Sequence, residues 1–84
     1  MSPTVVKRTQ TGVRIESSLL KVLKGLAEYT DLSLGDLLEG IVLHAFEGKS
    51  PFTEDTRGVI EKLKVVYGCE LNATNSHRLV EGEQ

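Results

Sequence analysis

The apolar positions of this chain follow a helical period over most of its length. Across residues 17–29, apolar side chains recur every three or four positions, and Lys21, Lys24 and Glu28 fall between them. This spacing places a single apolar stripe along a helix. The stripe consists of Leu19, Leu20, Leu23, Leu26 and Ala27. We predict a helix here, with Ser17 or Ser18 as its N-cap.

A second helix is predicted after a tight turn at Thr30-Asp31-Leu32. Ser33, followed three residues later by Asp36, has the pattern of a capping box, so Ser33 should be the N-cap. The apolar positions that follow fit the helical series from i to i+12 without a gap. They are Leu34, Leu37, Leu38, Ile41, Val42, Ala45 and Phe46. This face is too wide for one short chain to cover, and Gly48 should end the helix.

A third helix is predicted over about residues 53–67, followed by a polar tail. Two acidic residues follow Thr53, where the positive end of a helix dipole favours them, and Gly68 follows the last apolar position. The apolar stripe consists of Val59, Ile60, Leu63, Val66 and Tyr67. We expect this stripe, apart from Val66, to pack back on the rest of the protein.

Residues 9–15 follow a different period, because their side chains alternate as in a half-buried strand. One face carries Thr9, Thr11, Val13 and Ile15, and the other carries Arg8, Gln10, Gly12 and Arg14. A lone strand leaves its backbone N–H and C=O groups without partners. We therefore expect a second copy to pair with it in a two-stranded ribbon, which fits the major groove of DNA. If these residues are not a strand, the alternative is a monomeric helix-turn-helix protein.

The composition predicts one small domain without a cofactor. A chain of 84 residues buries only about 60–65% of its unfolded surface, so oligomerisation is a natural way to complete its core. A single cysteine, Cys69, excludes an intrachain disulfide, and His44 and His77 lack metal-ligand spacing. We find no nucleophile–base pair and expect neither a metal site nor an enzyme. No apolar run follows Met1, so we expect a cytoplasmic protein without a signal peptide or membrane span.

The charge is distributed unevenly, although the net charge is only −2. Residues 1–24 hold five basic residues and one acidic residue, a net charge of +4, whereas residues 25–84 hold five basic and eleven acidic residues, a net charge of −6. The basic part contains the predicted strand, and a dimer would double it. This asymmetry favours a nucleic-acid partner.

The order of these elements resembles the ribbon-helix-helix repressors of the Arc, methionine-repressor and CopG type. The resemblance covers about residues 8–47. It rests on Gln10-Thr11-Gly12-Val13-Arg14-Ile15, on Leu20, Leu23 and Ala27, and on Asp31-Leu32-Ser33-Leu34 leading to Leu38, Val42 and Phe46. It implies a mainly α homodimer with one strand per chain paired across the dimer. Residues 1–7 would be a flexible arm, residues 8–48 the DNA-binding and dimerisation domain, and residues 49–84 a C-terminal extension.

The resemblance also implies roles for individual residues. Base contacts fall to Gln10, Gly12 and Arg14, although Gly12 departs from the pattern because it has no side chain to read a base. Phosphate contacts fall to Lys7, Arg8, Lys21 and Lys24, and to Ser33, Leu34 and Gly35 at the start of the second helix. The dimer core would consist of Val13, Ile15, Leu23, Leu38, Ile41, Val42 and Phe46.

Three functions remain open from the sequence. The first is a transcriptional regulator, in particular a repressor, that binds double-stranded DNA as a homodimer or a higher-order assembly. The second is an antitoxin whose residues 50–84 bind a toxin protein. The third is a dimerisation module that does not bind DNA. The basic N-terminal part favours the first two.

Overall fold

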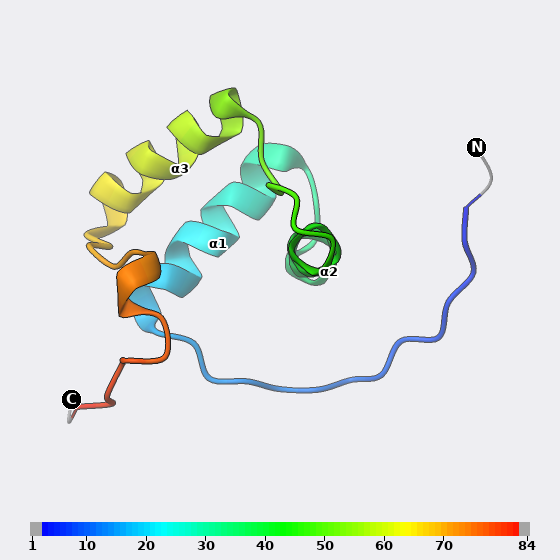
Figure 1. The fold of residues 1–84 in the computed structure, drawn as a ribbon, viewed down its shortest axis with the longest axis horizontal. Coiled ribbons are helices and arrows are strands. Elements are labelled where there is room, and N and C mark those ends of the chain that lie inside the picture. The colour runs from blue at the N-terminus through cyan, green and yellow to red at the C-terminus, as the bar shows by residue number, and fades with distance from the viewer. Residues whose placement is uncertain (1–2, 83–84) are drawn as a thin grey trace.

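The computed structural model describes residues 3–82, which form three α-helices and one short 3-10 helix. Helix α1 spans Ser17–Thr30, α2 spans Leu34–Phe46 and α3 spans Glu54–Tyr67, and the 3-10 helix η1 spans Ala73–Asn75. Figure 1 shows α1 and α3 running side by side, with α2 seen end-on beside them. The prediction of a mainly helical chain is confirmed. None of the described helices is long and apolar enough to cross a membrane.

The ends of α2 and α3 follow the capping signals in the sequence. The Ser33 hydroxyl accepts a hydrogen bond from the Asp36 N–H at 3.1 Å, which confirms Ser33 as the N-cap. Gly48 adopts a left-handed conformation, with φ at 69°, just beyond the end of α2. Gly68 does the same after α3, with φ at 66°. Both predicted helix ends are therefore confirmed. Glycine adopts the left-handed conformation without steric cost, which explains its use at these positions.

The start of α1 differs from the prediction. Its N-cap is Glu16 rather than Ser17 or Ser18. The Glu16 carboxylate accepts hydrogen bonds from the Leu19 N–H at 2.9 Å and from the Ser18 hydroxyl at 2.7 Å. The longer glutamate side chain reaches the same N–H that a serine cap would bind. These bonds, the one from Ser18 first, lower the pKa of Glu16.

The core lies where the three helices meet. Leu26 and Ala27 of α1 and Leu37 of α2 are buried together. Partly buried side chains from all three helices and the α2–α3 connection surround them: Leu23, Ile41, Phe52, Ile60 and Leu63. The third helix therefore packs on the rest of the protein, as predicted, and α1 is its main neighbour.

A glycine in α1 allows α3 to approach closely. A Cβ atom at Gly25 would lie 3.1 Å from Cδ2 of Leu63 and 3.5 Å from Cε2 of Tyr67. Glycine in a helix interior costs about 1 kcal/mol relative to alanine. The contact with Leu63 and Tyr67 supplies a packing reason for a residue that otherwise weakens the helix.

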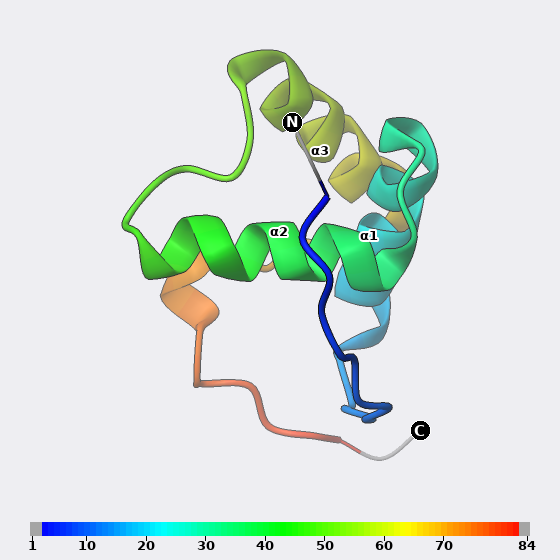
Figure 2. The same ribbon diagram turned by 90° about the vertical axis from the view of Figure 1, so that its right-hand side faces the viewer.

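No strand forms within residues 3–82, so the strand predicted at residues 9–15 is absent from the single chain. These residues are drawn out and irregular, and Figure 2 shows the N-terminal segment crossing α2. The expected partner strand belongs to a second copy, and without it nothing pairs with this backbone. The predicted arm at residues 1–7 and tail at residues 69–84 lie partly outside the described residues.

The packing of α3 predicts a difference between two aliphatic truncations. Ile60→Ala should lower the free energy of unfolding by about 2 kcal/mol, because Ile60 packs against the buried cluster. Val66→Ala, on the exposed side of the same helix, should change it by less than about 0.5 kcal/mol. Urea unfolding monitored by circular dichroism measures both values. Equal effects would mean that α3 does not pack as described.

Candidate nucleic-acid interface

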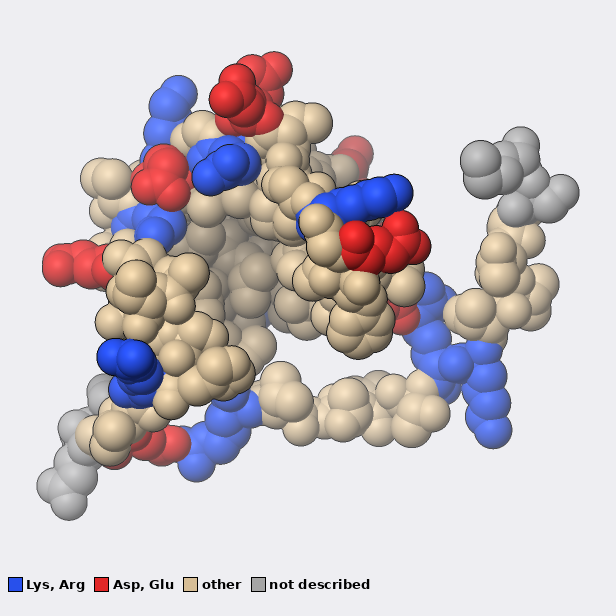
Figure 3. Space-filling view, in the orientation of Figure 1, with Lys and Arg blue, Asp and Glu red and all other residues tan. Residues whose placement is uncertain are grey.

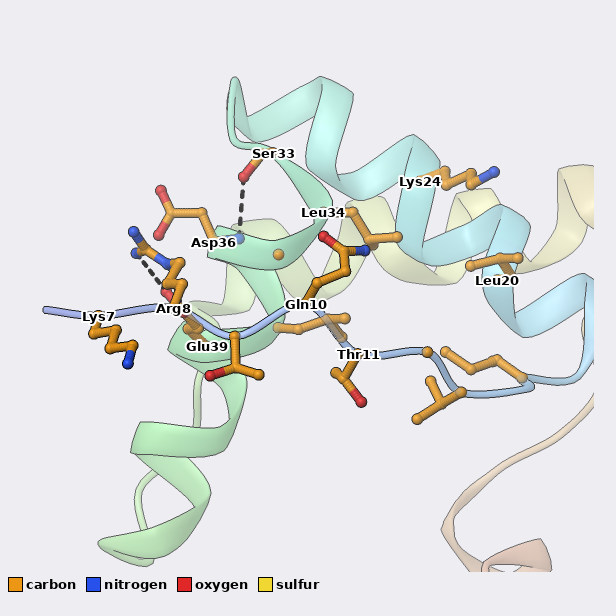
Figure 4. Close-up of a pocket in the computed structure, with 16 residues that line it drawn as sticks. Lys7, Arg8, Gln10, Thr11, Leu20, Lys24, Ser33, Leu34, Asp36 and Glu39 are labelled. Atoms are coloured by element: carbon orange, nitrogen blue, oxygen red, sulfur yellow. Dashed lines mark hydrogen bonds and ion pairs between the residues drawn. The ribbon is translucent and has the colours of Figure 1, made fainter.

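An open groove of about 1040 Å³ lies between the N-terminal segment and the N-terminal parts of α1 and α2 (Figure 4). The groove is lined by residues 7–13, Ile15, Leu20, Lys24, residues 33–36, Leu38 and Glu39. It therefore brings together two predicted base-contact positions, Gln10 and Gly12, and most of the predicted phosphate contacts. Lys21 and Arg14 are not among the lining residues. Lys21 is exposed on α1.

The N-terminus of α2 opens into this groove. The Ser33 carbonyl accepts a hydrogen bond from the Leu37 N–H at 3.0 Å, and the Ser33 side chain caps Asp36. The N–H groups of Leu34 and Gly35 belong to the first turn and have no acceptor within the helix. A Cβ atom at Gly35 would meet nothing within 4 Å, so the backbone there is accessible. The geometry suits an anion, although Asp36 places a carboxylate in the same turn.

Arg8, expected to contact phosphate, is already paired within the chain. Its Nε and Nη2 atoms donate to the two carboxylate oxygens of Glu39 at 2.9 and 2.8 Å (Figure 4). This bidentate pair fastens the N-terminal segment to the middle of α2. The hydrogen bond with Glu39 raises the pKa of Arg8, and the hydrogen bond from Arg8 lowers the pKa of Glu39. For Arg8 to reach phosphate it must first leave Glu39.

In the single chain, neighbouring side chains of the N-terminal segment point to opposite sides, but the sides differ from those predicted. Figure 4 shows Gln10 pointing toward Leu34, whereas Thr11 points away from it, which reverses the predicted sides. Val13, expected in the core, is 74% exposed. The pairing register of a strand decides which of its side chains face the core, and in the single chain no partner strand fixes the register. The inward face was predicted for the paired strand, so it stays a prediction for the dimer, and in the single chain Val13 is exposed.

Arg14 lies against the C-terminal tail instead of the groove. Its guanidinium forms an ion pair with Glu81. A second, smaller groove is lined by residues 14–17 and 79–82. Figure 3 shows basic side chains at both ends of the drawn-out N-terminal segment, and a basic and an acidic side chain in contact beside the C-terminal tail. The predicted base-reading residue thus has an acidic partner that the sequence analysis missed.

In the single chain, the residues of the predicted dimer core fall into three groups. Leu23 and Ile41 pack against their own chain's cluster, and Ile15 and Leu38 are half-buried along the first groove. Val42 and Phe46, in the C-terminal half of α2, are exposed. Leu43 beside them is 64% exposed and was not predicted. The run Ile41-Val42-Leu43 was the available signal, because consecutive apolar residues place apolar surface on more than one side of a helix.

The ion pair between Arg8 and Glu39 predicts a pH-dependent release of the N-terminal segment. The pKa of Glu39 is depressed below its ordinary value of 4.5, so the pair is intact above that value and is lost as the pH falls through the lowered pKa. Glu39→Gln should release residues 7–10 at neutral pH, and Glu28→Gln, an exposed carboxyl on α1, should not. Backbone ¹⁵N order parameters measure the release. Unchanged order parameters in Glu39→Gln would contradict the contact.

Comparisons of this chain with models of protein families, with curated proteins and with solved structures each found no match.

Proposed function

We propose that this protein is a homodimeric, sequence-specific DNA-binding transcriptional regulator of the ribbon-helix-helix type. In the proposed dimer, residues 9–15 of two copies pair as a ribbon that enters the major groove. The observation that carries the proposal is a basic, drawn-out segment without a backbone partner beside apolar side chains that the chain leaves exposed. A second copy would pair with the backbone of this segment and would also cover these apolar side chains.

The exposed area of the chain supports a dimer. The chain exposes 7531 Å², whereas a compact monomer of 9.2 kDa exposes about 4900 Å². The excess is roughly 2600 Å² per chain, or about 5200 Å² for two chains, which lies at the upper end of the total area buried in obligate homodimers. The radius of gyration, 14.2 Å, likewise exceeds the value of about 12 Å typical of a compact domain of this length.

The exposed apolar residues lie where a ribbon-helix-helix dimer needs them. Val13 lies in the segment proposed as the ribbon, and Val42, Leu43 and Phe46 lie on α2. Pairing of the two segments would also fix the register and turn Val13 inward. Under this proposal the first groove, with Ile15 and Leu38 on its walls, receives part of the second copy.

The proposed DNA contacts follow from the same arrangement. Arg14 would donate two hydrogen bonds to a guanine, and Gln10, once turned outward by pairing, would bind an adenine. The N–H groups of Leu34 and Gly35 would bind a phosphate at the N-terminus of α2. Lys7 and Lys24, on the walls of the same groove, would bind neighbouring phosphates. Gly12 offers only its backbone to a base.

The antitoxin alternative needs an apolar surface of residues 50–84 that is free for a toxin. Ile60 and Leu63 of α3 instead pack against the core of their own chain. Val65 and Val66 of α3 and Leu79 and Val80 of the tail are exposed, so some apolar surface remains for a partner protein.

A pair of equally exposed positions tests the dimer. Phe46 on α2 and Val65 on α3 are each 82% exposed in the single chain, so an aspartate at either position should leave the core intact. Phe46→Asp should convert the dimer to a monomer by placing a charge in the proposed interface. Val65→Asp should remain a dimer. Sedimentation equilibrium measures the mass, and a wild-type monomer at all concentrations would refute the dimer.

A second experiment separates base reading from charge attraction. Sequences bound by the wild-type protein are first selected from a random DNA pool. Arg14→Ala should then weaken binding to the selected duplex by about 1–3 kcal/mol for each lost bidentate contact, and it should reduce the preference for guanine. Lys7→Ala should weaken binding to the selected and the scrambled duplex alike, and it should reduce the salt dependence of the binding constant by about one phosphate contact. Titrations at several salt concentrations measure both. If Arg14→Ala changes the affinity for neither duplex, the ribbon does not contact DNA.

A further inference from the structure

We infer that the C-terminal tail, residues 79–82, is an internal competitor that occupies Arg14 when DNA is absent. The inference rests on the proposed function. Its basis is the ion pair between Arg14 and Glu81, which joins residues 67 positions apart. Beyond this ion pair, residues 79–82 and residues 14–17 line the two sides of one groove. The tail lies along the end of the segment that would read DNA.

Local structure after α3 returns the tail to this place. Gly68 ends the helix in a left-handed conformation, and the Cys69 N–H donates to the Lys64 carbonyl at 2.8 Å. Cys69 is buried, which anchors the connection to the folded body. These contacts fix where the returning chain begins.

A compact turn then reverses the chain. Asn72 and Asn75 cap η1, because the Asn72 side chain accepts from the Thr74 N–H at 3.0 Å and the Asn75 side chain accepts from the Asn72 N–H at 2.9 Å. The Arg78 N–H donates to the Asn75 carbonyl at 3.0 Å, and His77 has φ at 64°, a left-handed conformation that few residues other than glycine adopt. The tail therefore leaves the turn in a defined direction.

The backbone at Arg14 stays close to the folded body whether or not the N-terminal segment pairs with a second copy. Only Ile15 and Glu16 separate Arg14 from the first residue of α1. The Glu16 cap holds this junction in place. Pairing of residues 9–15 with a second copy would thus leave Arg14 within reach of the tail.

The tail and DNA exclude each other because they need the same donors. A carboxylate accepts hydrogen bonds from guanidinium N–H groups, and so do the O6 and N7 atoms of guanine. Arg14 cannot make bidentate contact with a guanine while Glu81 holds its Nη2 atom. The side chains of Arg14 and Glu81 are 84% and 67% exposed, so the pair is weak and DNA can displace it. A competitor of this strength should lower specific affinity by about two- to fivefold per chain.

The experiment compares Glu81→Gln, a chain ending at Arg78, and the matched control Glu70→Gln. Glu70 is an exposed carboxyl of the same C-terminal extension and is absent from the ion pairs of the described residues. Each protein is titrated with a labelled duplex selected by the wild-type protein and with its scrambled version. The Arg14 Nε–Hε resonance is recorded without DNA. The same Glu81→Gln change is repeated in Arg14→Ala.

We expect Glu81→Gln and the shortened chain to bind the selected duplex about two- to fivefold more tightly per chain than Glu70→Gln does. The scrambled duplex should gain less, and the gain should vanish in Arg14→Ala. The Arg14 resonance should move in Glu81→Gln and not in Glu70→Gln. If the Arg14 resonance does not move in Glu81→Gln, the tail does not occupy Arg14 and the inference is wrong, whatever the DNA titrations give. If it moves but affinity matches Glu70→Gln, competition is absent. If no duplex is selected at all, the proposed function fails together with the inference.

Discussion

The small size of the core is the constraint on which the rest of this structure depends. Three helices meet around Leu26, Ala27 and Leu37, and the close approach of α3 at Gly25 completes that cluster. A core of this size covers one side of α2 and leaves the side with Val42 and Phe46 exposed. The N-terminal segment finds no partner for its backbone either. Burying these groups requires surface that the chain itself does not have.

The helices were predictable because their signals are local. A helical period, a capping serine at Ser33 and left-handed residues at Asp31 and Gly68 act within a few positions of one another. The strand is absent from the single chain, where no other segment pairs with residues 9–15 within the described residues, and its register has no local determinant. Glu16 was missed as a cap because serine is the more usual cap residue, although the longer carboxylate reaches the same N–H.

The candidate site was only partly predictable, because long-range charge pairs have no sequence period. The groove gathers most of the residues expected to contact DNA, since the chain order places the N-terminal segment beside the start of α2. The pairing of Arg8 with Glu39 and of Arg14 with Glu81 depends on how distant segments fold back. The uneven charge of the two parts of the chain was interpreted as favouring a nucleic-acid partner, and it does not indicate which residues pair within the chain. The positive potential expected of the N-terminal part is therefore smaller than its charge suggests.

These internal pairs change what DNA binding would involve. A free arginine releases only water and counterions when it binds DNA, whereas Arg14 would also exchange one acceptor, Glu81, for another. A phosphate contact by Lys7 or by the start of α2 requires no such exchange. The tail would therefore act mainly on the mode of binding in which Arg14 reads a base, and far less on attraction to the DNA backbone. By linkage, DNA bound in that mode must weaken the hold of the tail by the same factor by which the tail weakens DNA. Because the competing ion pair is exposed, this coupling would be small, and the tail would adjust specific binding without abolishing it.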